Sequence, residues 1–133
     1  MIQEDMRGHD SKQASMLCLI SPESVVPADH PLRAMKKLVE VVLRELSPVF
    51  DAMYSSTGRP SIPPERLLKA TVLMTLYTVR SERIFCEQLG YNLLWLWFLD
   101  RELNEGSFDH SVFAKNYQRV LSADVAKLFF AEV

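Results

Sequence analysis

The 133-residue sequence predicts an all-α protein, a compact helical domain built around one buried central helix. Three observations support this fold class. Residues 65–78 are apolar almost throughout, which is typical of a helix that other helices surround. Residues 32–46 repeat apolar side chains at steps of three and four, the spacing of one helix face. Proline, serine, aspartate and glycine stand where such helices would begin and end.

The central helix is expected over residues 65–78. Pro63 and Pro64 fix φ where this helix begins, and the first turn of a helix does not need their missing N–H groups. The charged residues within the helix are Glu65, Arg66 and Lys69. All other positions are apolar or threonine, so the helix should be covered on nearly every side.

A shorter helix is expected next. Ser81 can cap its start, and Gly90 suits the position just past its end at Leu89. The cations around these two helices are Arg59, Arg66, Lys69, Arg80 and Arg83. Two helices joined by a short break and surrounded by cations raise the possibility of a DNA-binding domain.

A long amphipathic helix is expected earlier in the chain. Asp29 is a good N-cap for it, and Pro31 suits its first turn. Its apolar residues form one stripe, which consists of Leu32, Met35, Leu38, Val39, Val42, Leu43 and Leu46. Because charged side chains occupy the opposite side, we expect the stripe to pack against the central helix rather than against a partner.

The remaining segments complete the organisation. Residues 1–24 are expected to be a loosely ordered arm whose apolar run Met16–Ile20 docks on the body, and residues 25–133 form the helical domain. Further helical segments are expected at Val49–Tyr54, Leu93–Leu99, Val112–Leu121 and Val125–Phe130. The aromatic residues of Leu93–Leu99 are Trp95, Trp97 and Phe98. Base stacking is one role for them, but core packing is favoured because no basic residue lies among them.

Composition limits the classes of function. The net charge of −2 gives no global positive field, although residues 31–90 carry nine basic and six acidic side chains between acidic flanks. Cys18 and Cys86 show no metal or redox spacing, so we expect two reduced thiols in a cytoplasmic protein. The apolar run Leu93–Leu99 is too short to span a bilayer, and no membrane partner is expected.

The sequence predicts no catalytic, metal-binding or cofactor-binding residues. Its acidic residues are scattered singly, and no pair is fixed at short helical spacing as metal-assisted chemistry would require. His9, His30 and His110 lie in the arm or at expected helix starts, where local hydrogen bonding is favoured over metal ligation. The chain also lacks a glycine-rich phosphate loop and a serine nucleophile motif. As given, it is not expected to be an enzyme.

The outer face of the Val112–Leu121 helix is the best candidate site. Ser111, Lys115, Gln118 and Arg119 fall together there. Lysine and arginine can meet phosphates or guanine edges, glutamine can pair with adenine, and a serine near a helix start can meet a phosphate. The alternative is a solvated surface with two cations.

The inner face of the same helix is expected to consist of Val112, Phe113, Tyr117, Val120 and Leu121. A recognition helix needs this side to be anchored on the preceding short helices, as in a helix-turn-helix. The C-terminal part is therefore expected to be helix-turn-helix-like.

Several stretches match a known family, in order and at the expected spacing. They are Val26–Ala34, Thr57–Leu68, Arg80–Arg83, Gln88–Leu94, Trp97–Phe98 and Val112–Asn116. Together they resemble the N-terminal domain of the InsH-type transposases of bacterial insertion sequences, from about Gly8 to the C-terminus. Leu96 and Tyr117 stand where that family often has arginine. Asp100 and Arg101 replace a small, apolar helix ending.

The resemblance implies a helical domain that helps a transposase to hold the terminal inverted repeats of its element. It also implies a following RNase H-like domain whose acidic residues hold divalent metals for strand cleavage and transfer. That DDE domain is not in this sequence, so no catalytic acid can be carried over. The leading prediction is a truncated transposase that binds DNA through Lys115, Gln118 and Arg119, supported by Ser111, Arg80, Arg83 and Arg59.

Two other interpretations stay open. The domain could be a helical module for transposase self-association, either as a homo-oligomer or with full-length copies whose assemblies it would poison. The apolar run Leu93–Leu99 and the apolar C-terminus favour this interpretation. The third interpretation is a non-functional remnant that merely folds.

Overall fold

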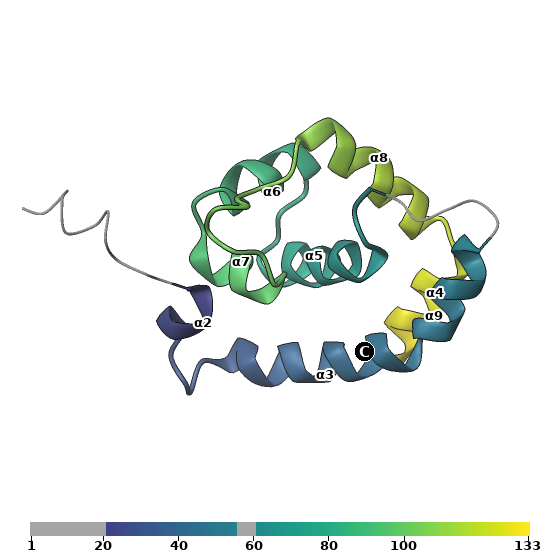
Figure 1. Cartoon of the computed structure of the whole chain (residues 1–133), viewed down its shortest axis with the longest axis horizontal. Helices are drawn as coiled ribbons and strands as arrows, with labels where there is room; N and C mark the ends of the chain where they lie inside the picture. The colour runs from purple at the N-terminus through teal and green to yellow at the C-terminus, as the bar shows by residue number, and fades with distance from the viewer. Residues whose placement is uncertain (1–20, 56–60) are drawn as a thin grey trace, which may run out of the picture.

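The computed structural model describes residues 21–55 and 61–133, and all regular secondary structure in these ranges is α-helical (Figure 1). The helices are α2 Pro22–Val25, α3 Pro31–Glu45, α4 Ser47–Tyr54, α5 Pro64–Leu76, α6 Glu82–Leu89, α7 Leu93–Phe98, α8 His110–Leu121 and α9 Asp124–Glu132. The all-α prediction is confirmed. The docking predicted for Met16–Ile20 falls outside the described residues, and α2 occupies the end of the predicted arm.

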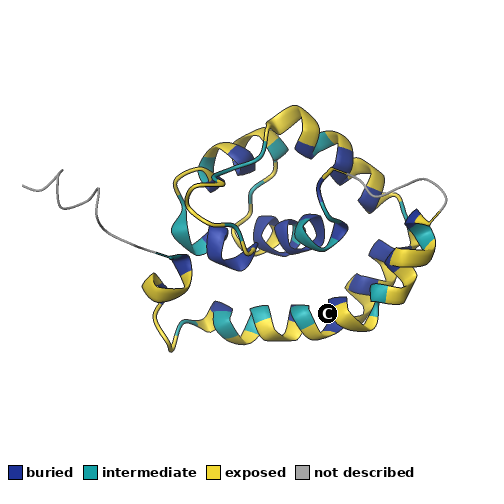
Figure 2. Cartoon of the chain, in the orientation of Figure 1, coloured by how far each residue is buried: buried dark blue, intermediate teal, exposed yellow. Residues whose placement is uncertain are grey.

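The central helix is α5, which lies between α3 on one side and α6 and α8 on the other (Figure 1). Leu67, Leu68, Ala70 and Leu73 are fully buried, and Figure 2 shows burial along most of the helix. A helix that is apolar all round is stable in water only when other helices cover it. Truncating one such leucine to alanine costs about 2–5 kcal/mol. The prediction of a buried central helix is confirmed.

The end of α5 is set by Thr78. This residue has a φ of 57°, so the helix ends at Leu76 and not at Thr78 as expected. The N–H of Val79 donates to the carbonyl of Met74 at 2.8 Å, which closes a Schellman motif. Glycine usually occupies the left-handed position of this motif, because a Cβ disfavours positive φ. The link between α5 and α6 therefore contains a strained threonine.

The amphipathic helix is α3, and two details of its prediction were wrong. Its N-cap is His30 rather than Asp29, because the His30 Nδ1 accepts the N–H of Leu32 at 3.1 Å. Leu38 is 45% exposed, although the rest of the predicted stripe is buried or half-buried. The backbone of α3 lies closer to α4 and α9 than to α5. The expectation that α3 packs against the central helix therefore left out two of its neighbours.

An ionic cluster of Lys36, Glu40, Lys69 and Asp100 bridges α3, α5 and the end of α7. The Lys69 Nζ lies 2.7 Å from Asp100 Oδ2 and 3.1 Å from Glu40 Oε2. The Lys36 Nζ lies 2.7 Å from Asp100 Oδ1 and 2.8 Å from Glu40 Oε2. The Lys69 side chain is only 6% exposed. Lys69 is therefore a structural residue, although the sequence analysis counted it among the cations around the central helix that raised the possibility of DNA binding.

The carboxyl groups of the ionic cluster have shifted pKa values. Burial raises the pKa of the Asp100 carboxyl, but hydrogen bonds from Lys36 and Lys69 outweigh burial, so the pKa lies below its ordinary value. The same balance lowers the pKa of Glu40. A carboxyl group whose pKa is lowered by folding stabilises the fold at pH values above its ordinary pKa. This contribution is lost as the pH falls through the pKa that the group has in the folded state. The ionic cluster should therefore contribute less to the stability of the fold at acidic pH.

An aromatic row connects α7, α6 and α8. Trp95 stacks on Phe85 with ring centroids 5.1 Å apart, Phe85 on Phe113 at 5.6 Å, and Phe113 on Tyr117 at 5.4 Å. Every aromatic residue of α7 is at most 5% exposed. Core packing is confirmed for these residues, and a base-stacking platform on α7 is excluded.

The ionic cluster gives the first prediction. Asp100 has a φ of 57°, and asparagine also tolerates this conformation, so Asp100→Asn keeps the backbone while it removes the charge and one of the two oxygens that accept from Lys36 and Lys69. Because Lys69 is buried and Asp100 is partly exposed, we expect the free energy of unfolding at pH 7 to fall by about 1–2 kcal/mol. Urea unfolding at pH 7 and pH 3 should show a smaller loss at the lower pH. Glu102→Gln, at an exposed position, is the control, and an equal loss at both pH values would contradict the pKa argument.

The strained threonine gives the second prediction. Thr78→Gly should raise the free energy of unfolding by about 0.5–1 kcal/mol, because glycine adopts positive φ without a steric penalty. Thr75→Gly, inside α5, is the matched control and should lower it by about 0.3 kcal/mol, because glycine is a poorer helix former than threonine. Thermal denaturation of the two variants measures both effects. A loss of stability in Thr78→Gly would show that the threonine makes contacts worth more than its strain.

Candidate nucleic-acid interface

The candidate helix is α8, and its start is well defined. It begins at His110, where the Asp109 Oδ2 accepts the N–H groups of Ser111 and Val112, both at 3.1 Å. Aspartate is among the best N-cap residues, since its carboxylate satisfies amides that have no partner within the helix. The helix predicted from Val112 therefore starts two positions earlier, with Ser111 in its first turn.

The inner side of α8 is fixed against α5 and α6, on which the helix packs directly. Phe113 is fully buried against Phe85 of α6. Asn116 is also buried, and its Nδ2 donates to the Val112 carbonyl at 2.8 Å and to the Ser61 Oγ at 3.2 Å. The bond to Ser61 ties α8 to the segment that precedes α5, and it therefore resists rotation of α8. The orientation of the outer face of α8 is thereby set.

The outer face of α8 consists of Ser111, Lys115, Gln118 and Arg119, and all four are exposed. At 100° per residue, these positions lie within an arc of about 100° on the helix. They come together on one surface, as expected. Their contact with DNA stays a prediction.

This outer face is cationic and unpaired. From His110 to Leu121, α8 contains no carboxylate. Within residues 21–55 and 61–133, neither Lys115 nor Arg119 lies within salt-bridge distance of an acidic side chain. Two positive charges about one helical turn apart are therefore free to meet an anion.

Other cations of the domain are occupied by internal contacts. The Arg33 Nη1 lies 2.7 Å from the Glu23 Oε2, and the Arg33 guanidinium also donates to carbonyls of the α2 region. Arg66 donates to the Asp100 carbonyl at 3.0 Å. Arg101 donates to the Gly106 carbonyl at 2.8 Å. These residues stabilise loops and helix ends, which separates them from the free cations of α8.

The predicted inner face of α8 needs two corrections. Val112 is 41% exposed and Leu121 is 36% exposed, so neither belongs to the buried side. Both residues flank the polar outer face. The buried side of α8 is narrower than the positions of its apolar residues in the sequence suggested. Leu96 and Tyr117, where the resembling family often has arginine, are both buried. Their lack of charge therefore takes nothing from the exposed surface.

The predicted supporting residues Arg80, Arg83 and Arg59 are not part of α8. Arg80 precedes α6 and Arg83 belongs to it, and both are exposed. Glu82 and Glu87 lie beside Arg83 in sequence and at one helical turn, so the surface of α6 carries mixed charge. Arg59 falls outside the described residues. The structure thus joins four of the predicted residues on α8, whereas Arg83 lies on α6 and Arg80 lies just before it.

The relation of α6 to α8 resembles a helix-turn-helix only in its packing. The second helix rests on the first, as in that motif. Residues 90–109, which include α7, join them, whereas a helix-turn-helix has a turn of about three or four residues. The sequence already predicted a helix and a loop between them, so the likeness to a helix-turn-helix is limited to the contact of α6 with α8.

Metal and thiol chemistry have no support in the described part of the chain. No group of three or more His, Cys, Asp or Glu residues there is arranged to hold a metal ion. Burial, with a smaller effect of the Asp109 charge, raises the pKa of the Cys86 thiol to about 11, so it is not a reactive thiolate at neutral pH. No helix among the described residues has the length and apolar character needed to cross a membrane.

One known protein family matches most of this chain. Residues 20–119 match a family described as a transposase domain (DUF772). The matched range covers more than half of the chain and includes every candidate residue from Arg59 to Arg119. No curated protein and no solved structure gives a significant match. The chain belongs to the DUF772 transposase domain family.

Proposed function

We propose that this chain is the DNA-binding part of a transposase and holds the terminal inverted repeats of its element. The observation that carries the proposal is the outer face of α8, where Lys115 and Arg119 are exposed on a helix without a carboxylate. The family supports a role in transposition. Strand cleavage and transfer would belong to a DDE domain outside this sequence.

The dimensions of α8 suit a duplex groove. A helix of 12 residues is about 18 Å long, and the major groove of B-DNA is about 12 Å wide and admits one helix. With its buried side on α5 and α6, α8 would enter the groove by its outer face. Lys115 and Arg119 would then lie about one turn apart, close to phosphates or base edges.

Each outer-face residue would have its own role. Arg119 offers a planar fork for a phosphate or for guanine, whereas Lys115 offers a point charge. Gln118 can form two hydrogen bonds with adenine. The Ser111 amide is already bound to Asp109, so Ser111 would contact a phosphate through its hydroxyl group. Arg80, Arg83 and Arg59 would add phosphate contacts outside the groove.

The charge balance constrains the mode of binding. Because the net charge is −2, the whole molecule does not attract DNA, and affinity must come from the local cationic face. Each phosphate contact releases condensed counterions, so affinity should fall as salt rises. We therefore expect binding that is measurable at low salt and weak at high salt.

The third prediction concerns this face. Lys115→Ala combined with Arg119→Ala should weaken binding to a duplex carrying the inverted repeat by about tenfold or more at low salt. The slope of log K against log salt concentration should become shallower by about 1.8, which corresponds to two lost contacts. Fluorescence anisotropy titrations at several salt concentrations measure both quantities.

The matched control is Lys37→Ala combined with Arg44→Ala. These two exposed cations lie on the outer side of α3 and remove the same charge from a different face. The control should leave affinity within about twofold of wild type, because the local field and not the net charge governs binding. An equal loss in both double variants, or no loss in either, would contradict a specific role of α8.

A second candidate function is self-association. An apolar groove between α4 and α9, lined by Val49, Met53 and Leu128 among others, favours it and lies apart from the outer face of α8. The two functions are compatible, since a transposase could bind DNA and associate through separate faces.

A further inference from the structure

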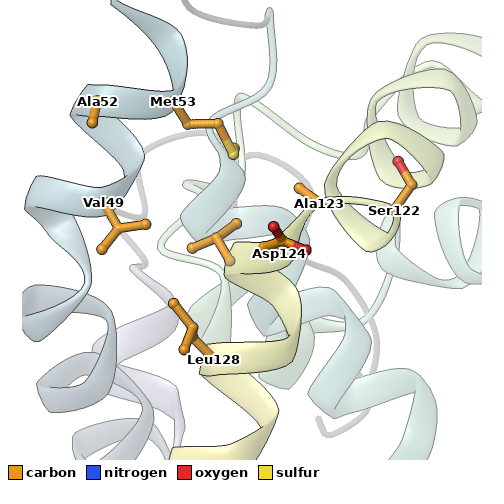
Figure 3. Close-up of a pocket in the computed structure, with 8 residues that line it drawn as sticks. Val49, Ala52, Met53, Ser122, Ala123, Asp124 and Leu128 are labelled. Carbon is orange, nitrogen blue, oxygen red and sulfur yellow. The ribbon is translucent and has the colours of Figure 1, made fainter.

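A groove lies between α4 and α9, with a volume of about 560 Å³ (Figure 3). Its apolar lining consists of Val49, Ala52, Met53, Ala123, Val125 and Leu128. The polar lining residues are Ser122 and Asp124. Figure 3 shows the side chains of Val49 and Met53 on α4 facing those of the α9 segment.

The groove leaves apolar surface in water. Val49 is 37% exposed and Leu128 is 47% exposed, whereas Val125 is 1% exposed and belongs to the buried core below them. Small side chains at Ala52 and Ala123 leave the space between the helices unfilled. Covering such a surface is favourable by about 25 cal/mol for each Å² of apolar area. The groove is therefore suited to an apolar segment.

The sequence contains a segment with matching chemistry. Met16–Ile20 is five consecutive apolar residues and is the longest apolar run outside the described ranges. It directly precedes Ser21, the N-cap position of α2. A segment of this length supplies two or three side chains on one side when extended, which suits a narrow groove between two helices.

The segment cannot fill the groove of its own chain. It joins α2, which packs on α7, where the Trp97 Nε1–H donates to the Glu23 Oε1 at 2.6 Å. The groove belongs to α4, at the opposite end of α3 (Figure 1). With 15 residues, α3 is about 22 Å long, whereas five extended residues span about 17 Å at most.

We propose that the groove between α4 and α9 binds Met16–Ile20 of a second copy of this chain. Each copy contributes one segment and one groove, so reciprocal exchange closes a two-fold dimer. Two copies of α8 are then carried by one assembly. This inference is independent of the DNA contact, because it uses neither α8 nor any cation.

The test is a complementation experiment with the full chain. A segment variant carries Leu17→Glu and Leu19→Glu, and a groove variant carries Val49→Glu and Leu128→Glu. Sedimentation velocity should show wild type as a dimer at tens of micromolar and each variant alone as a monomer. An equimolar mixture should dimerise again, because the intact groove of one variant can bind the intact segment of the other. The dimer of the mixture should be at least tenfold tighter than that of either variant alone.

Two controls separate association from folding. Leu38→Glu combined with Val41→Glu places the same charges on exposed apolar residues of α3 and should leave the dimer intact. Circular dichroism should show that all variants remain helical. If the groove variant unfolds, Ala52→Phe replaces it, since this exposed residue lines the groove and a larger side chain fills it.

Three outcomes would overturn the proposal. A wild-type chain that stays monomeric at 100 µM has no such contact. A segment variant that still dimerises shows that grooves pair with each other or that another surface is used. A mixture that remains monomeric, although both variants are folded, shows that segment and groove do not recognise each other.

Discussion

The structure depends on the burial of α5. This helix has no polar face of its own, so it exists in water only inside a ring of other helices. Its one buried charge, Lys69, is held between Glu40 of α3 and Asp100 at the end of α7. Breaking a buried ion pair leaves a charge in a poorly hydrated place, which is strongly destabilising. The apolar surface of α5 therefore draws the helices together, and Lys69 specifies which of them meet.

This arrangement also explains why α8 can present a cationic surface. Phe113 and Asn116 hold its inner side against the core, so its outer residues are not needed for folding. Most cations nearer the core are engaged by carboxylates or carbonyls, as with Lys36 and Arg101. Lys115 and Arg119 are left free because α8 carries no acidic residue. Cations such as Lys36 and Arg101 therefore stabilise the domain, whereas Lys115 and Arg119 are available to a partner.

The sequence predicted the helices and their order because hydrophobic spacing and capping residues are local signals. It also predicted the exposed set Ser111, Lys115, Gln118 and Arg119, since a helical repeat of 3.6 residues places them on one side. It could not predict the pairing of Lys69 with Asp100, which are far apart in sequence and meet only in the fold. The available signal for that pairing was a lysine placed among the apolar residues of the central helix.

Other differences between the predicted and the observed structure also depend on contacts between helices or on the backbone conformation. The exposure of Leu38 and Val112 depends on how neighbouring helices are placed, and periodicity does not contain that information. The N-cap moved from Asp29 to His30 because two adjacent residues could both cap, and only the backbone conformation decides between them. The long connection between α6 and α8 was divided correctly into a helix and a loop, but the stacking of Trp95 on Phe85 could not be predicted from the sequence. Local structure was thus more predictable than tertiary contacts.

The proposed contact of DNA with the outer face of α8 can be measured directly. Titration of the isotope-labelled chain with an inverted-repeat duplex, followed by NMR of the backbone amides, tests it residue by residue. If α8 enters the groove, the largest shifts should lie at Ser111, Lys115, Gln118 and Arg119, and the outer side of α3 should stay unchanged. Shifts confined to α3 or α9, with α8 unaffected, would contradict it.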